Sequence, residues 1–278
     1  MPYGAVPYSG VVRRIDSPKN PLIKTLARLK ERRQRERERR YLIEGQREVQ
    51  RALEAHIPLT HLLHAPEIAP DVAAEIAAAD TALAEEVEEL ELSRAAFERL
   101  SLRQRPDGLI AVAKMQERSL ADLTLPSGAL ALVIDGVEKP GNVGALLRTA
   151  DAGQLDAVLL TGAGTDLYNP NVIRASVGSV FSRPVLSVDE DEGLDFLRAG
   201  NFKLVAATPA ASALYWSEPY TGSTAFILGT EHAGLGDTWL RAATARVAIP
   251  MHGLADSLNV SVAGALLIYE ALRQRSQG

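Results

Sequence analysis

The chain has 278 residues, of which 23% are charged and 46% hydrophobic, as in soluble globular proteins with one large or two modest domains. The absence of cysteine excludes disulfides, thiolate metal sites and a cysteine nucleophile, and the five histidines lack metal-ligand spacing. No apolar run is long enough to span a bilayer, and residues 1–12 lack the pattern of a secretory signal. We therefore expect a cytoplasmic protein with no metal and no membrane partner.

The net charge of −5 conceals an uneven distribution. The segment 11–51 contains fourteen Lys and Arg and six Asp and Glu, a balance of about +8. The segment 66–98 contains ten acidic residues and one Arg, a balance of about −9. The two segments nearly cancel, so the total hides a strongly basic stretch near the N-terminus.

Helices and strands alternate between residues 15 and 115, after a tail at 1–14 that is rich in turn-forming residues. Such alternation favours a compact α/β domain with a small central sheet. His61 and His64 are predicted to lie at the surface or at a strand edge. Ser93 is expected to cap a helix. The predicted helices are 22–37, 46–55, 69–79 and 94–101, and the predicted strands are 41–44, 59–64, 82–88 and 109–114.

A linker at 116–127 precedes a second α/β pattern over 128–278. Its strands are continuously apolar rather than alternating, which indicates a mostly parallel sheet covered on both faces. In such sheets ligands bind beyond the carboxyl ends of the strands. The predicted strands are 129–134, 157–161, 204–207, 225–228 and 245–249, and the predicted helices are 142–152, 170–179 and 258–273.

Three segments that follow strands of this sheet carry polar groups and glycines. The segment 134–150 runs through a glycine loop into a helix and contains Asn142 and Arg148. Taken alone, Asn142 would be a helix N-cap and Arg148 a solvated side chain. The segment 226–236 contains Gly229, which permits close backbone approach, and then Glu231.

The third segment, 249–271, places Ser257 and Asn259 at the start of an apolar helix that is unusually rich in small residues. Small side chains let backbones approach closely, which suits a pocket built of main chain. Because parallel strands end at one edge of a sheet, the three segments are expected to converge there. This convergence favours a functional role for each of them over a purely structural one.

Together the three segments resemble the SpoU (TrmH-like) branch of the SPOUT RNA methyltransferases over about residues 130–273. Lys139 departs from the family, which more often has Asp before the Pro-Gly-Asn turn. The start of the chain is similar, more loosely, to the N-terminal substrate-binding domain of the rRNA-modifying members. The matching motifs are Asn142-x-Gly144-x-x-x-Arg148-Thr149, Leu228-Gly229-x-Glu231-x-x-Gly234-Leu235, Ile249-Pro250-Met251-x-Gly253, Ser257-Leu258-Asn259-Val260-Ser261-Val262-Ala263 and, near the N-terminus, Ser17-Pro18-x-Asn20-Pro21-x-Ile23-Lys24 with Ile43-Glu44-Gly45.

The resemblance implies a parallel-sheet α/β domain with a deep trefoil knot, a rare exception to the rule against threading, and a smaller N-terminal α/β domain resembling a ribosomal-protein RNA-binding fold. It implies a homodimer that transfers a methyl group from S-adenosylmethionine to a ribose 2′-hydroxyl. Carried over by position, the residues that hold the cofactor are Gly229, Ile249, Leu258, Thr208 and Met251. The active-site positions are Asn142, Arg148, Glu231, Ser257 and Asn259.

Two roles are open for Arg148. The family role is a base that activates the hydroxyl, although a guanidinium is effectively always protonated. The alternative is that Arg148 grips the adjacent phosphate and stabilises the developing alkoxide. In the dimer, Arg148 of one chain would complete the site of the other.

The basic helix near the N-terminus is predicted to dock RNA through phosphate contacts, which would make binding strongly salt-dependent. The structural alternative is a solvated helix face with i,i+4 pairs between Glu and Arg. The predicted RNA contacts are Arg28, Arg32, Arg33, Arg35 and Arg39.

The sequence thus predicts a two-domain S-adenosylmethionine-dependent 2′-O-ribose methyltransferase acting on ribosomal RNA, with 23S rRNA as the favoured substrate. One alternative is the same chemistry on tRNA, and another is a non-catalytic RNA-binding assembly factor. A dehydrogenase is disfavoured because the GxGxxG fingerprint is absent. The target nucleotide, and the choice between antibiotic resistance and ribosome maturation, stay open.

Overall fold

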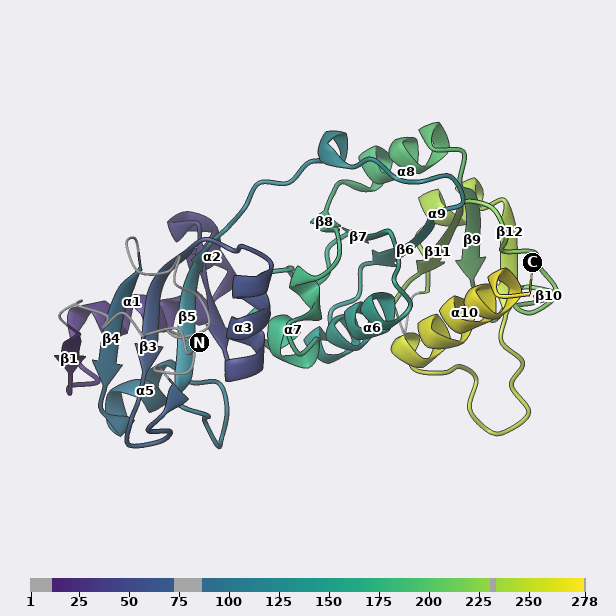
Figure 1. Cartoon of the computed structure of the whole chain (residues 1–278). Helices are drawn as coiled ribbons and strands as arrows, with labels where there is room; N and C mark the ends of the chain where they lie inside the picture. Colours follow the sequence, from purple (N-terminus) through teal and green to yellow (C-terminus); the bar gives the residue numbers. More distant parts are fainter. Residues whose placement is uncertain (1–11, 73–86, 231–233, 278) are drawn as a thin grey trace, which may run out of the picture. The chain divides into compact units, whose positions relative to one another are not determined.

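The computed structural model describes residues 12–72, 87–230 and 234–277. The chain divides into two compact units (Figure 1). The first comprises the residues up to Gln116 together with Tyr168–Arg174, and the second comprises Glu117–Leu167 and Ala175–Gly278. Among the described residues, no helix is both long and apolar enough to cross a membrane.

The first unit is built on a five-stranded sheet of order β1-β4-β3-β5-β2. Strands β1, β4 and β3 run parallel, whereas β5 is antiparallel to both β3 and β2. The strands are β1 (Arg13–Ile15), β2 (Arg40–Glu44), β3 (Leu59–His64), β4 (Glu88–Leu92) and β5 (Leu109–Lys114). The helices are α1 (Pro21–Ala27), the 3-10 turn η1 (Arg28–Lys30), α2 (Arg32–Glu38), α3 (Gln46–Glu54) and α5 (Arg94–Leu100).

Side-chain caps fix where two of these helices begin. Asn20 caps α1 by accepting a 2.9 Å hydrogen bond from the Leu22 N–H, and Pro21 takes the first helical position, where its missing N–H costs nothing. Ser93 caps α5 as predicted, accepting from the Ala96 N–H at 3.3 Å. Both helices pack their apolar residues onto one face of the sheet, where Ile23, Leu26, Phe97 and Leu100 belong to a single buried cluster.

The predicted single helix at 22–37 is wrong, because the chain breaks at Glu31, whose backbone is extended. The guanidinium of Arg35 explains the break. It is 1% exposed and donates to the carbonyl oxygens of Leu29 and Lys30 at 2.9 and 2.8 Å. Carbonyls at a helix end need donors, and Arg35 supplies them. Arg35, predicted to contact RNA, therefore uses its guanidinium within the fold.

Contacts with acidic residues of β4 accompany two further differences in this unit. Arg13 and Arg14, assigned to the tail, belong to β1 and pair with Glu88 and Glu91 of β4. His61 and His64 are nearly buried rather than at the surface, facing Glu88 and Glu89, and burial lowers the pKa of both imidazoles. Most of the predicted helix 69–79 and strand 82–88 lies outside the described residues.

The second unit contains a seven-stranded sheet of order β10-β12-β9-β11-β6-β7-β8 in which every pairing is parallel. The predicted parallel α/β architecture is confirmed. The strands are β6 (Leu130–Asp135), β7 (Ala157–Thr161), β8 (Val185–Ser187), β9 (Lys203–Ala207), β10 (Ala213–Leu214), β11 (Thr224–Leu228) and β12 (Ala245–Ala248). The helical segments of this unit are η3 (Leu120–Asp122), α6 (Pro140–Ala152), η4 (Ser179–Phe181), α8 (Glu190–Ala199), α9 (Asp237–Ala242) and α10 (Val260–Arg275), whereas α7 (Pro170–Ala175) belongs, except for Ala175, to the first unit.

Helices cover both faces of this sheet. Because side chains alternate along a strand, Val133 and Ile227 point to the face where α8 and α9 bury Leu197 and Trp239. Helices α6 and α10 lie side by side on the opposite face (Figure 1), where α10 also contacts β11. The sheet therefore has a covered core on each side, and its strand ends are the places where ligands can reach the backbone.

Several boundaries differ from the predicted ones. Helix α6 begins at Pro140, which places Asn142 in its first turn rather than at the N-cap. The helix predicted at 170–179 ends at Ala175, because Val177 and Gly178 adopt positive φ. The predicted linker includes η3, which buries Leu120 in the core of the second unit. Elements β8, β10, α8 and α9 had no counterpart in the prediction.

Candidate active site

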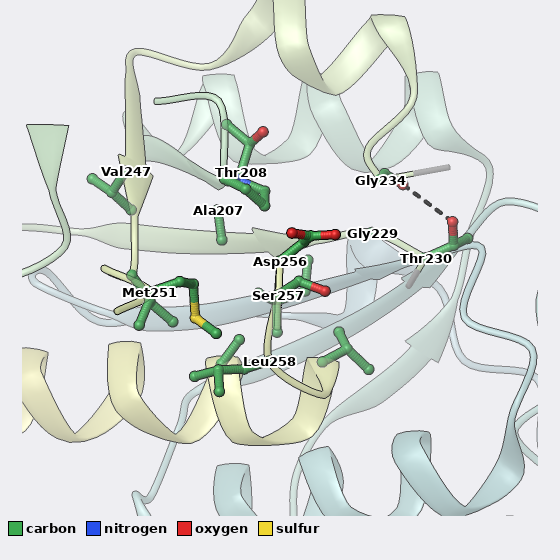
Figure 2. Close-up of a pocket in the computed structure, with 15 residues that line it drawn as sticks. Ala207, Thr208, Gly229, Thr230, Gly234, Val247, Met251, Asp256, Ser257 and Leu258 are labelled. Carbon is green, nitrogen blue, oxygen red and sulfur yellow. Dashed lines mark hydrogen bonds between the residues drawn. The ribbon is translucent and has the colours of Figure 1, made fainter. Parts of the chain in front are cut away.

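A cavity of about 400 Å³ lies at the carboxyl ends of β9, β11 and β12 in the second unit (Figure 2). Its volume is that of a small-molecule site. Its lining is mostly apolar, with hydroxyl groups and one carboxylate. The lining residues are Ala207, Thr208, Pro209, Leu228, Gly229, Thr230, Gly234, Val247, Ile249, Met251, Asp256, Ser257, Leu258, Val260 and Ala263.

All five residues predicted to hold the cofactor line this one cavity, although they come from three separate segments of the chain. Ser257, predicted for the active site, lines it too. Sequence reasoning did not select Asp256 or Thr230, which also line it. Each of these two directly neighbours a selected residue, Ser257 and Gly229 respectively, so the motif spacing could have found them.

Gly229 stands where β11 ends, and the chain beyond it folds back tightly. The Thr230 N–H donates to the Gly234 carbonyl at 2.9 Å, and the Gly234 N–H donates to the Thr230 carbonyl at 3.1 Å. A Cβ added at Gly229 would lie 2.1 Å from the Gly234 carbonyl oxygen. Only glycine fits there, and the result is a cavity wall made of main chain. Glu231, predicted for the active site, lies outside the described residues.

Asn259 links the third segment to the first. It is the N-cap of α10, and its side-chain oxygen accepts from the Ser261 N–H at 2.9 Å. Its amide nitrogen donates to the side-chain oxygen of Asn142 at 3.1 Å, across 117 residues of sequence. The Asn259 side chain therefore both caps α10 and contacts Asn142, and so fixes the start of α10 against the first turn of α6.

Arg148 projects from α6 as an exposed side chain. It is six positions beyond Asn142 on the same helix, or about 9 Å along its axis. It is not among the described residues that line the cavity. Within the described part of the chain, its guanidinium has no hydrogen-bond or ion-pair partner, so its charge is available to a ligand.

Asp135, at the end of β6, braces the loops beside the cavity. Its buried carboxylate accepts from the Thr161 hydroxyl at 2.9 Å and from the Gly236 N–H at 3.4 Å. Burial raises the pKa of the nearby Glu190 carboxyl, and the Asp135 carboxylate raises it further. Asp135 thus connects the end of β6 to the loop that carries Gly234.

The arginines of the first unit that are predicted to contact RNA differ in their exposure and in their partners. Arg28 and Arg33 are exposed and have no side-chain partner among the described residues. Arg32 pairs with Glu36 at 2.8 Å, the i,i+4 geometry of a solvated helix face. Arg39 is exposed at the end of α2, with a left-handed backbone.

Among the described residues there is no group of three or more His, Asp or Glu that could hold a metal ion.

Comparison with known proteins gives two family matches. The family described as SpoU rRNA Methylase matches residues 129–269, and the MRM3-like substrate binding domain matches residues 20–111. The chain is also 32% identical over 263 residues to the 23S rRNA (guanosine(2553)-2′-O)-methyltransferase RlmP of Bacillus subtilis, covering 93% of this chain and 98% of that protein.

Solved structures of RNA methyltransferases are also similar to this chain. A crystal structure of an RNA 2′-O ribose methyltransferase is 50% identical, with a TM-score of 0.82 and coverage of 95% of this chain and 99% of that one. The SpoU methyltransferase AviRb of Streptomyces viridochromogenes, in complex with AdoMet, is 27% identical, with a TM-score of 0.85 and coverage of 94% and 100%. The chain belongs to the SpoU rRNA methylase family.

Proposed function

We propose that this protein transfers a methyl group from S-adenosylmethionine to a ribose 2′-hydroxyl of ribosomal RNA. The observation that carries the proposal is the single cavity that gathers Gly229, Ile249, Met251, Leu258 and Thr208 at the carboxyl ends of three parallel strands. The B. subtilis relative is named for the same reaction on 23S rRNA.

The cavity suits the cofactor. The main-chain wall at Gly229 leaves backbone groups within reach of a ligand, and the apolar side chains of Ile249, Met251 and Leu258 complement its uncharged parts. When bound, S-adenosylmethionine supplies an electrophilic methyl group on a sulfonium centre. We assign Gly229, Ile249 and Leu258 to holding the cofactor chiefly through their main chain, with Thr208 and Met251 beside them.

The remaining polar groups position the nucleophile. The hydrogen bond between Asn142 and Asn259 holds the starts of α6 and α10 together, and Ser257 lines the cavity. Arg148, exposed and unpaired in the described part of the chain, grips the phosphate next to the target ribose and stabilises the alkoxide that develops on its oxygen. Much of the rate enhancement then comes from in-line placement.

Two units with separate tasks support ribosomal RNA as the substrate. The match to a substrate-binding domain over residues 20–111 lies in the first unit, which also carries the exposed Arg28 and Arg33. We assign RNA docking to this unit and methyl transfer to the second. We further propose that the reaction takes place in the cytoplasm.

A homodimer with a knotted catalytic unit is part of the proposal. The knot is proposed from the family resemblance; in the structure the chain returns after β12 so that α10 packs on α6 and β11. Exposed apolar side chains gather near α10, where Val262 and Tyr269 are 47% and 54% exposed and flank a groove with Tyr215 and Leu266. Sedimentation should give twice the chain mass of 29.9 kDa, and a monomeric mass would contradict the dimer.

The test of the reaction is incubation of the full chain with methyl-labelled S-adenosylmethionine and either unmodified 23S rRNA or unmodified tRNA. We expect label in the rRNA alone. Label in tRNA alone would move the substrate assignment to tRNA. Binding of the cofactor with no label in either RNA would favour a non-catalytic RNA-binding protein.

A further inference from the structure

Asp256 carries the one ionisable side chain among the described residues that line the cavity. In the view of Figure 2 its carboxylate lies between the side chains of Thr208 and Ser257, which line the same cavity. No hydrogen bond or ion pair joins this carboxylate to any other residue that the structure describes, and the side chain is exposed in the open cavity.

A ligand that fills the cavity removes water from this carboxylate. Removing this water costs much free energy unless the ligand provides a positive charge or a hydrogen-bond donor in its place. The other polar side chains of the lining belong to Thr208, Thr230 and Ser257, which are all neutral. The cavity therefore favours a ligand with a cationic group and disfavours a ligand of the same shape without one.

We propose that Asp256 binds a positive charge of the cofactor and makes the cavity selective for charge. The inference rests on the proposed function. S-adenosylmethionine has two cationic centres, the sulfonium and the α-ammonium. Its demethylated product, S-adenosylhomocysteine, keeps only the ammonium, and 5′-methylthioadenosine has neither. Because 5′-methylthioadenosine also lacks the amino-acid arm with its carboxylate, the effect of a change at Asp256 is compared for each ligand separately.

The experiment is calorimetric titration of the full chain with each of the three ligands. Wild-type protein is compared with Asp256→Asn, which removes the charge and keeps the size, and with Asp256→Glu, which keeps the charge. Asp195→Asn is the matched control, because Asp195 is exposed on α8 and does not line the cavity. We expect Asp256→Asn to weaken S-adenosylmethionine binding about tenfold, as the loss of one charge-assisted contact does.

The pattern across ligands identifies the contact. A loss confined to S-adenosylmethionine supports pairing with the sulfonium. A loss shared with S-adenosylhomocysteine but not with 5′-methylthioadenosine supports pairing with the ammonium. In either case Asp256→Glu should retain part of the affinity, and raising the salt concentration should weaken wild-type binding more than Asp256→Asn binding.

Two results overturn the inference while leaving the proposed function intact: unchanged affinities in Asp256→Asn, or equal losses for all three ligands, which would mean a change of shape. If the wild-type protein binds none of the three compounds, the proposed function fails and this inference fails with it.

Discussion

At the scale of single residues, replacement of Arg148 is expected to slow methyl transfer without weakening cofactor binding. Its guanidinium is exposed on α6 and outside the cavity lining. Arg148→Ala should lower the rate of methyl transfer by about 100-fold or more, the cost of losing one charge-stabilising donor. The dissociation constant for S-adenosylmethionine, measured by calorimetry, should stay within twofold of the wild-type value.

The control for this variant is Arg198→Ala, an exposed arginine at the end of α8, which should leave both quantities unchanged. Arg148→Lys adds a test of the role, because lysine keeps the charge but loses the two-pronged grip on phosphate. Full turnover by Arg148→Ala would remove this residue from the mechanism.

The five residues that the family resemblance assigns to the cofactor line one cavity, because each directly follows a strand or lies in a motif loop. Sequence reasoning placed other residues less well. Residue types and spacing were not sufficient for Arg35. An arginine in a run of arginines and glutamates looks solvated, and only the fold shows its guanidinium buried against the carbonyls of Leu29 and Lys30. Asp256 was missed because it lies one residue before the motif that begins at Ser257, although the motif spacing could have found it.

At the scale of elements, α6 contains a pair of glycines that differ in what surrounds them. A Cβ at Gly144 would lie 2.4 Å from the Ala175 Cβ and 2.7 Å from backbone atoms of Ala175 and Ser176, whereas Gly141 has nothing within 4 Å. Gly144→Ala should therefore lower the free energy of unfolding by about 1–3 kcal/mol, the usual cost of overpacking.

Urea unfolding monitored by circular dichroism measures this difference, and Gly141→Ala is the control in the same helix. Alanine has the higher helix propensity, so Gly141→Ala should be neutral or stabilising by up to about 1 kcal/mol. Equal effects of the two substitutions would show that α6 does not pack closely on the segment that follows α7.

Long apolar strands were predictable as elements, since burial on both faces requires a continuous apolar run. The short edge strands β8 and β10 and the helices α8 and α9 were not. Strand β10 has two residues, and α9 has six, too few for any periodicity to emerge. The break between α1 and α2 also involves a local contact that the helical pattern does not reveal, that of the Arg35 side chain with the carbonyls of Leu29 and Lys30.

At the scale of the whole molecule, RNA affinity should depend on the exposed arginines of the first unit. The double variant Arg28→Ala, Arg33→Ala removes two charges that have no partner in the described part of the chain. If both contact phosphates, the slope of log affinity against log salt concentration should become shallower by about 1.4–1.8. Filter binding to 23S rRNA at several salt concentrations measures it.

The matched control replaces two exposed arginines of the second unit, Arg198 and Arg241, by alanine, and its slope should equal that of the wild type. An unchanged slope in the first-unit variant would show that Arg28 and Arg33 do not contact phosphate. Arg35 is unsuitable for this test, because its removal would leave the end of η1 without a donor.

The cavity and Arg148 are proposed together to direct a methyl group to a ribose oxygen. The most direct measurement is mass-spectrometric mapping, at single-nucleotide resolution, of unmodified 23S rRNA after reaction with the full chain and S-adenosylmethionine. We predict one new methyl group, on a ribose 2′-oxygen, that is absent after reaction with Arg148→Ala. A methyl group on a base, or no methyl group from a wild-type protein that binds the cofactor, would contradict the account.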